Sequence, residues 1–128
     1  MLSLLEILLA DGQKKADILK KFETGDRAEV LCAYENDVET GRAVAEFDAD
    51  TVYIMRLQID DARYGFTDAG ILADLLIRSA LNAGINRSAI YAESEICGFD
   101  EAFLQLGFTK FEDRFRAFIP DIFKKHCR

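Results

Sequence analysis

Hydrophobic and polar positions along this chain follow two periods, and the changes between them divide the sequence into strands and helices. Residues 51–59, TVYIMRLQI, give the clearest strand. Strict alternation predicts one apolar face, made by Tyr53, Met55, Leu57 and Ile59. The opposite face changes from Val52 and Ile54 to Arg56 and Gln58. The later half of this strand therefore faces something polar, either solvent or a binding cleft.

The strongest helical pattern follows in residues 71–84, ILADLLIRSALNAG. Its apolar positions predict one buried stripe, made by Ile71, Leu72, Leu75, Leu76, Ala80 and Ala83. Gly84 is expected to end the helix. Residues 89–94 then indicate a short strand, so a strand-helix-strand crossover with two parallel, neighbouring strands is predicted.

Shorter patterns predict the remaining elements. They are a strand over 2–9, a helix from Asp11 to Phe22, strands over 28–34 and 42–47 joined by Glu35 to Gly41, a helix from Phe99 to Leu106 stopped by Gly107, and one long strand or a tight hairpin from Phe108 to Ile119. A helical turn is the alternative for residues 2–9, which satisfy neither period cleanly. The expected fold class is α/β, with a mixed sheet that begins antiparallel and ends in the parallel crossover.

Size and charge narrow the possible functions. A chain of 128 residues and 14.4 kDa has the usual size of one domain. Its 23 acidic and 16 basic residues give a net charge of −7, which disfavours nucleic acid as a partner. The apolar opening, residues 1–10, is too short to span a bilayer and has no leading basic segment, so neither membrane insertion nor export is expected.

The thiols and the single histidine offer little obvious chemistry. Cys32, Cys97 and Cys127 are too far apart in sequence for a zinc or redox motif, which fits a reducing cytoplasm. His126 lies beside Cys127 in a segment expected to be a tail, so no metal site is predicted. The sequence leaves the roles of these four residues open.

Two segments carry a family resemblance. Gln105-Leu106-Gly107-Phe108, directly after the short helix, resembles the ending typical of the GNAT superfamily of N-acetyltransferases. LQID, residues 57–60, followed by a loop and GILADLLIRSALNAG, resembles that superfamily's fourth strand and acetyl-CoA-binding helix. The resemblance covers residues 28–118 in element order. It implies a single GNAT-like domain and acyl transfer from a CoA thioester to an amine.

The resemblance also implies where acetyl-CoA binds. The expected cofactor-binding residues are Leu57, Gln58 and Ile59 on the strand, and Asp68, Ala69, Gly70, Ile71 and Leu72 at the helix start. Members of the superfamily hold the pyrophosphate on backbone N–H groups there, within the pattern Arg/Gln-x-x-Gly-x-Gly/Ala. On residues 67–72 only Gly70 agrees with that pattern. Asp68 is expected to cap the helix, which would occupy a donor and repel the anion.

The resemblance gives a mixed picture of the catalytic groups. Phe103 stands where the family often has a tyrosine that protonates the departing thiolate, and we expect its ring to pack in the core with Phe99. The carboxylates near the predicted crossover are Asp60, Asp61, Glu46 and Glu93. Glu93 is the preferred catalytic base because ligands settle at strand ends beside a switch in sheet direction.

Two functions remain open from the sequence. The first is a GNAT-type N-acyltransferase acting on a small-molecule or peptide amine. The second is a catalytically inactive GNAT-like binding or assembly module, favoured by Asp68, Leu72 and Phe103 together. An unrelated α/β enzyme has no nucleophile or phosphate motif to support it. The acceptor, the acyl chain and the oligomeric state, a homodimer included, are left open.

Overall fold

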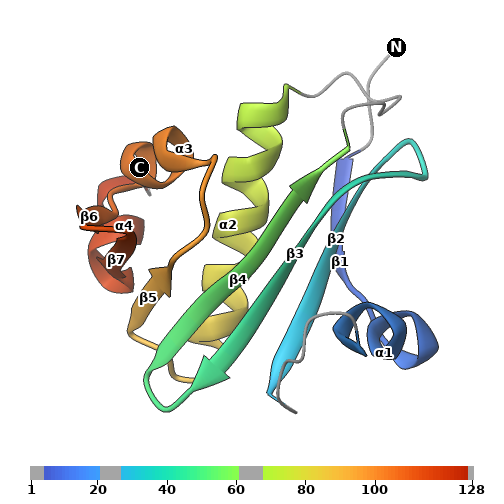
Figure 1. The fold of residues 1–128 in the computed structure, drawn as a ribbon, viewed down its shortest axis with the longest axis horizontal. Helices are drawn as coiled ribbons and strands as arrows, with labels where there is room; N and C mark the ends of the chain where they lie inside the picture. Colours follow the sequence, from blue (N-terminus) through green and yellow to red (C-terminus); the bar gives the residue numbers. More distant parts are fainter. Residues whose placement is uncertain (1–4, 21–26, 61–67, 127–128) are drawn as a thin grey trace.

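A computed structural model describes residues 5–20, 27–60 and 68–126 of the chain. Within these residues, seven strands form one sheet in the order β1-β2-β3-β4-β5-β7-β6 (Figure 1). The elements are β1 (Leu5–Leu9), α1 (Gly12–Lys20), β2 (Ala28–Glu35), β3 (Val38–Asp48), β4 (Thr51–Ile59), α2 (Ala69–Ile85), β5 (Tyr91–Ser94), α3 (Asp100–Leu106), β6 (Thr109–Phe111), β7 (Arg114–Phe118) and α4 (Ile119–His126).

The sheet is antiparallel except at one pair of strands. β4 and β5 run parallel, with Thr51 opposite Tyr91 and Ile54 opposite Ser94. They are joined through α2, so the predicted crossover and the mixed α/β class are confirmed. The crossover places the end of β5 beside the middle of β4, which decides where the candidate site lies.

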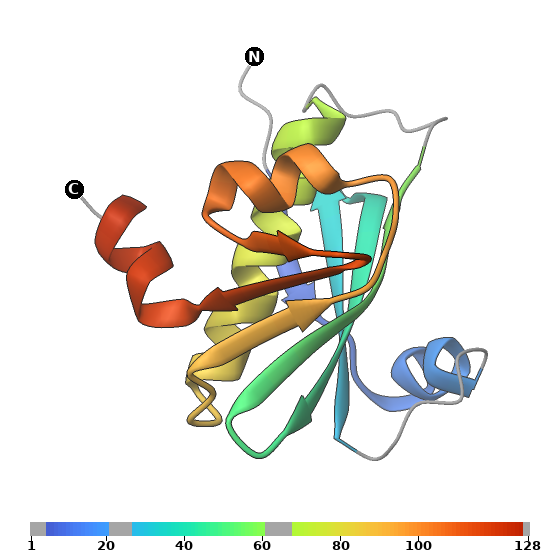
Figure 2. The ribbon, with the colours of Figure 1, turned by 60° about the vertical axis from the view of Figure 1, so that its left-hand side comes forward.

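Helices cover the two faces of the sheet unequally (Figure 2). The main core lies on the face covered by α2, α3 and α4, and includes Ile54, Leu76 and Phe115. A smaller cluster on the opposite face joins Ile18 of α1 to Val30 and Val44. Because α1 lies over the β2–β3 side, the same face is left open over β4, β5 and β7.

The buried stripe of α2 differs from the prediction. Leu72, Leu76 and Ala80 are buried as expected, but Ile71 is 57% exposed and Ile77 and Leu81 are buried in its place. The helix also continues past Gly84 to Ile85. A Cβ at Gly84 would lie 3.0 Å from Val52 Cγ1, so this glycine permits close helix-to-sheet packing rather than ending the helix.

The β2–β3 hairpin is tighter than the sequence indicates. The expected connection, Glu35 to Gly41, contains only a two-residue turn at Asn36 and Asp37, with φ angles of 52° and 68°. Positive φ at both central positions is the geometry that matches the twist of two antiparallel strands, and Asn and Asp tolerate it. β3 therefore begins at Val38, and the prediction of a strand only over 42–47 was too short.

The C-terminal third forms a hairpin and a helix. Of the two forms predicted for Phe108 to Ile119, the hairpin of β6 and β7 is the one observed. The expected tail was wrong, because α4 begins at Ile119 and extends to His126. Pro120 in the first turn and the spacing of the buried Ile119 and Ile122 are the signals for this helix.

Candidate active site

The parallel strands β4 and β5 form a fork that opens beside the end of β5. Their pairing covers only residues 51–54 of β4 and 91–94 of β5. β4 then runs on past the end of β5 (Figure 2). At the closed end, the Ser94 hydroxyl donates to the main-chain carbonyl of Ile54 at 2.9 Å. Beyond this bond, the β5 side of residues 55–59 has no paired strand among the described residues.

A β-bulge at Met55 corrects the predicted faces of β4. Val44 of β3 lies opposite Arg56, while the next residue, Ala45, lies opposite Ile54, which leaves Met55 as the extra residue. An extra residue reverses the alternation beyond it. The core face is therefore made by Val52 and Ile54 and then by Leu57 and Ile59. The expected face of Tyr53, Met55, Leu57 and Ile59 was wrong for this reason.

An open cleft of about 930 Å³ lies at the fork. Its walls come from the end of β3, the strands β4 and β5, the segment leading to α3, and the start of β7. The lining residues are Glu46, Asp48, Tyr53, Ile54, Met55, Arg56, Leu57, Gln58, Glu93, Ser94, Glu95, Ile96, Cys97, Phe99 and Arg114. The carboxylates in this set outnumber the guanidinium groups, so the cleft favours a cationic or neutral ligand over an anionic one.

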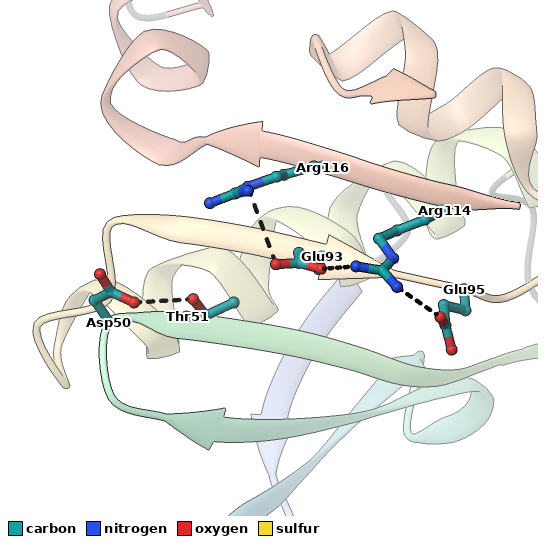
Figure 3. Close-up of polar contacts among 6 residues, drawn as sticks. All are labelled: Asp50, Thr51, Glu93, Glu95, Arg114 and Arg116. Atoms are coloured by element: carbon teal, nitrogen blue, oxygen red, sulfur yellow. Dashed lines mark hydrogen bonds and ion pairs between the residues drawn. The ribbon is translucent and has the colours of Figure 1, made fainter. Parts of the chain in front are cut away.

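Glu93 lies in this cleft but is engaged by arginines (Figure 3). Arg114 Nη1 lies 3.4 Å from Glu93 Oε1, and Arg116 Nε lies 4.0 Å from Glu93 Oε2. Arg114 also reaches Glu95, at 3.5 Å. The cross-strand pairing of Glu93 with Arg116 fixes part of this arrangement. Both oxygens of Glu93 thus have an arginine nearby.

Glu46 and Tyr53 differ from Glu93 in having no contact with an arginine among the described residues. They are opposite each other in β3 and β4, and Glu93 is the parallel neighbour of Tyr53. Both side chains are half-buried and line the cleft. Within the described residues, neither the Glu46 carboxylate nor the Tyr53 hydroxyl has a hydrogen-bond or ion-pair partner. These two groups are therefore available to a bound ligand.

The start of α2 shows the expected cap. Asp68 is the N-cap residue, and its Oδ1 accepts a hydrogen bond from Gly70 N at 2.8 Å. The N–H groups of Ala69 and Ile71 belong to the same first turn, where a helix supplies no acceptors of its own. The helix start thus keeps some donors for an anion, while Asp68 occupies one and adds a negative charge beside them.

The structure groups only some of the sequence-predicted site residues. Leu57, Gln58 and Glu93 line the cleft together. Ile59 lines a neighbouring pocket of about 250 Å³, which also includes Gln58. The helix-start residues, Asp68, Ala69, Gly70, Ile71 and Leu72, line neither. Asp61 and Thr67 lie outside the described residues.

Phe103 is a core residue, as predicted. It is fully buried and does not line the cleft. Its ring stacks on Phe115 at a centroid distance of 4.9 Å and contacts Phe108 edge-on at 5.0 Å. Phe99, the expected neighbour, packs against the same core cluster and also lines the cleft. A hydroxyl at position 103 would therefore point into the aromatic core.

The described thiols occupy different environments. Cys97 is exposed and lines the cleft, whereas Cys32 is buried beneath α1. Burial raises the pKa of the Cys32 thiol, and Glu39 beside it raises this pKa further. Among the described residues, no three His, Cys, Asp or Glu side chains are arranged to hold a metal ion. No helix in the described ranges is long and apolar enough to cross a membrane.

Sequence reasoning missed two parts of this site. The bulge at Met55 has no signal in the alternation itself, because apolar residues stand on both sides of it. Ser94 could have been found, since a serine at a buried strand position requires a hydrogen-bond partner. Glu46 was among the carboxylates considered, and only the fold shows that, within the described ranges, it has no ion-pair partner whereas Glu93 has two.

Comparisons with solved structures identify the fold. An acetyltransferase from Bacillus subtilis in complex with CoA has a TM-score of 0.66 at 15% identity, covering 90% of this chain and 99% of that one. The ribosomal-protein-S18-alanine N-acetyltransferase from Escherichia coli has a TM-score of 0.68 at 12% identity, covering 88% and 91%. The KacTA-DNA complex has a TM-score of 0.63 at 17% identity, covering 95% and 98%.

The chain therefore has the fold of the GNAT acetyltransferases. No protein-family model matches the sequence, and no curated protein matches it significantly. Since one similar structure is a complex with DNA, the fold alone does not exclude a nucleic-acid partner.

Proposed function

We propose that this protein is an acyl-CoA-dependent N-acyltransferase whose reaction takes place in the cleft between β4 and β5. The single observation that carries this proposal is the fork, where β4 loses its parallel neighbour after Ile54 and opens onto the cleft. A free strand edge presents main-chain N–H and C=O groups to an extended ligand. Four similar solved structures contain CoA or acetyl-CoA, which supports such a ligand here.

The donor is proposed to bind along this free edge and at the start of α2. The amide-bearing pantetheine arm suits the backbone of Leu57, Gln58 and Ile59, which is paired with β3 on the other side. The pyrophosphate suits the first turn of α2, at Ala69, Gly70, Ile71 and Leu72. Asp68 opposes this part of the fit, because its carboxylate already accepts from Gly70 N. We therefore expect weak binding.

The acceptor is proposed to be a small-molecule or peptide amine. Glu93 is the sequence-predicted base, and that role stays a prediction. Its contacts with Arg114 and Arg116 favour a positioning role, in which the fixed carboxylate orients the ammonium group of the acceptor. The net charge of −7 favours a cationic amine over nucleic acid as the partner.

A binding or assembly module without transferase activity is the second candidate. The hydrogen bond between Asp68 and Gly70 favours it, because this bond removes a donor that the pyrophosphate needs. Phe103 also favours the module. The resemblance places this buried residue where the family usually has a proton donor, and a phenylalanine ring has no proton to give.

Calorimetric titration with acetyl-CoA, followed by a thioester-cleavage assay over a panel of amines, tests the proposal. Met55→Glu should weaken acetyl-CoA binding at least tenfold, because it places a carboxylate in the cleft beside an anionic ligand. Val38→Glu is the matched control, since Val38 and Met55 are each 39% exposed and Val38 lies at the distant β2–β3 hairpin. Turnover would exclude the module. Binding without turnover, or no binding at all, would contradict the transferase and leave the module.

A further inference from the structure

Among the described residues, one carboxylate and one hydroxyl of the cleft have no partner. Glu46 and Tyr53 are cross-strand neighbours on the open face of the sheet. We propose that Glu46 takes a proton from the acceptor amine and that Tyr53 gives its phenolic proton to the departing thiolate. This inference rests on the proposed acyl transfer and assigns its two proton-transfer groups.

The other carboxylates and the other hydroxyl of the cleft already have partners among the described residues. Arg114 holds both Glu93 and Glu95, and Asp48 lies 3.9 Å from Arg27. The Ser94 hydroxyl donates to the Ile54 carbonyl, and it would have to break this hydrogen bond before it could give its proton to another group. A base that is already paired must lose an ion pair before it can accept a proton. Glu46 has no such contact with the described residues.

Tyr53 also has a suitable position along β4. It directly precedes Ile54, the last residue paired with β5. A donor that enters at the wide end, near Ile59, and follows the free edge brings its thioester to the closed end of the fork. Tyr53 lines the cleft at this end, between Glu46 and Glu93 in register. Among the described residues, it is the only tyrosine that does so.

The proposed transfer needs only the amine and the thioester as reactants. An ammonium group first loses one proton to the Glu46 carboxylate, which leaves a neutral amine. The amine nitrogen attacks the thioester carbonyl carbon, so that a C–N bond forms and the C–S bond breaks. The sulfur leaves with the electron pair and takes the proton of Tyr53. The second proton released by the nitrogen restores the phenol, and Glu46 returns its proton to water.

Kinetics of two conservative variants test these roles. Acetyl-CoA is the donor, and the acceptors are lysine, spermidine and a peptide with an N-terminal alanine. Glu46→Gln and Tyr53→Phe should each lower kcat about a hundredfold or more, as expected for a positioned acid or base. Affinity for acetyl-CoA should stay within twofold of the wild type in both variants.

Matched substitutions outside the cleft control for general effects. Glu101→Gln removes an exposed carboxylate on α3 that contacts Gln105, and Tyr34→Phe removes a hydroxyl bound to Lys14 beneath α1. Both should retain wild-type turnover. If Glu46→Gln or Tyr53→Phe also retains it, the proposed roles are wrong while the transferase function stands.

A measurement independent of turnover tests the role of Tyr53 separately from the proposed transferase function. In protein labelled with ¹³C at the tyrosine ring carbon that bears oxygen, the signal lost in Tyr53→Phe identifies Tyr53. Saturating CoA should shift this signal, because the thiol binds beside the phenol. CoA binding that leaves the signal unmoved overturns the role of Tyr53 alone. Absence of CoA binding, or of wild-type turnover with every amine, overturns the transferase function and the inference together.

Discussion

Ser94 donates a hydrogen bond from its hydroxyl to the main-chain carbonyl of Ile54, 2.9 Å away, across the last residues at which β4 and β5 are paired. The bond joins the two strands at the point where they separate. Both residues are buried, so water cannot replace either partner. The width of the candidate cleft at its closed end therefore depends on this contact.

Replacing Ser94 with alanine should destabilise the protein by about 1–2 kcal/mol, because a buried carbonyl loses its donor. Urea denaturation measures the change. Ser79→Ala is the control, since Ser79 Oγ donates to Leu75 O within α2 and that carbonyl belongs to a helix. We expect its effect to stay within about 0.5 kcal/mol. Equal effects of the two variants would show that the fork contact has no special role.

Asp68→Gly should strengthen acetyl-CoA binding about tenfold, because it removes both a negative charge and the acceptor that occupies Gly70 N. Asp68→Asn removes the charge but keeps a side-chain oxygen for the cap, so a gain of about threefold is expected. Calorimetry measures both affinities, and thermal melting confirms that each variant is folded. Unchanged or weaker binding in Asp68→Gly would mean that the helix start does not face the donor.

Phe103→Tyr should not raise turnover, even though the sequence resemblance places Phe103 where the superfamily often has a tyrosine. The ring is fully buried between Phe108 and Phe115, so the added hydroxyl enters the core and not the cleft. An unsatisfied buried hydroxyl should cost about 1–3 kcal/mol of stability. Denaturation and the thioester assay together check this. A clear gain in turnover would place the reacting sulfur at α3 and contradict the role of Tyr53.

Glu39 should make stability fall in acid. Burial alone would raise the pKa of this carboxyl, but Arg42 at 2.6 Å, the Cys32 thiol and Lys14 outweigh it and lower the pKa below its ordinary 4.5. A lowered folded pKa gives a contribution that is complete above about pH 4.5 and lost as the pH falls through the folded value. Glu39→Gln lacks this contribution, so its unfolding free energy should lie below that of the wild type at pH 7 and approach it in acid.

Urea denaturation of the wild type and Glu39→Gln across pH 3 to 7 measures this convergence. Glu101→Gln is the control for the general loss of a negative charge. Among the described residues Glu101 contacts Gln105 and no cation, so this variant should not show the convergence. A constant difference between the wild type and Glu39→Gln at every pH would show that the ion pairs of Glu39 do not stabilise the fold.

Local patterns were sufficient for most elements of the fold. Residues 51–59 were placed as a strand with the observed ends, and Gly107 ends α3 with a φ of 114°, as a glycine after a helix predicts. The buried faces of these elements were less predictable from the sequence. The stripe of α2 is rotated toward Ile77 and Leu81 because almost every position of this helix is apolar, so only packing selects the buried side.

The amino-acid sequence by itself determined most strands and helices and the cap at Asp68, because each depends on residues close together in the chain. It also indicated the parallel crossover, because a strand, a helix and a second strand in succession usually connect parallel neighbours. Only the tertiary structure decided the bulge at Met55, the Ser94–Ile54 bond and which carboxylate of the cleft is paired. Glu93 and Arg114 are 21 residues apart, and Glu46 becomes a candidate only because the arginines face Glu93 instead. Such contacts depend on strand register, and strand register is fixed when the whole sheet packs against its helices.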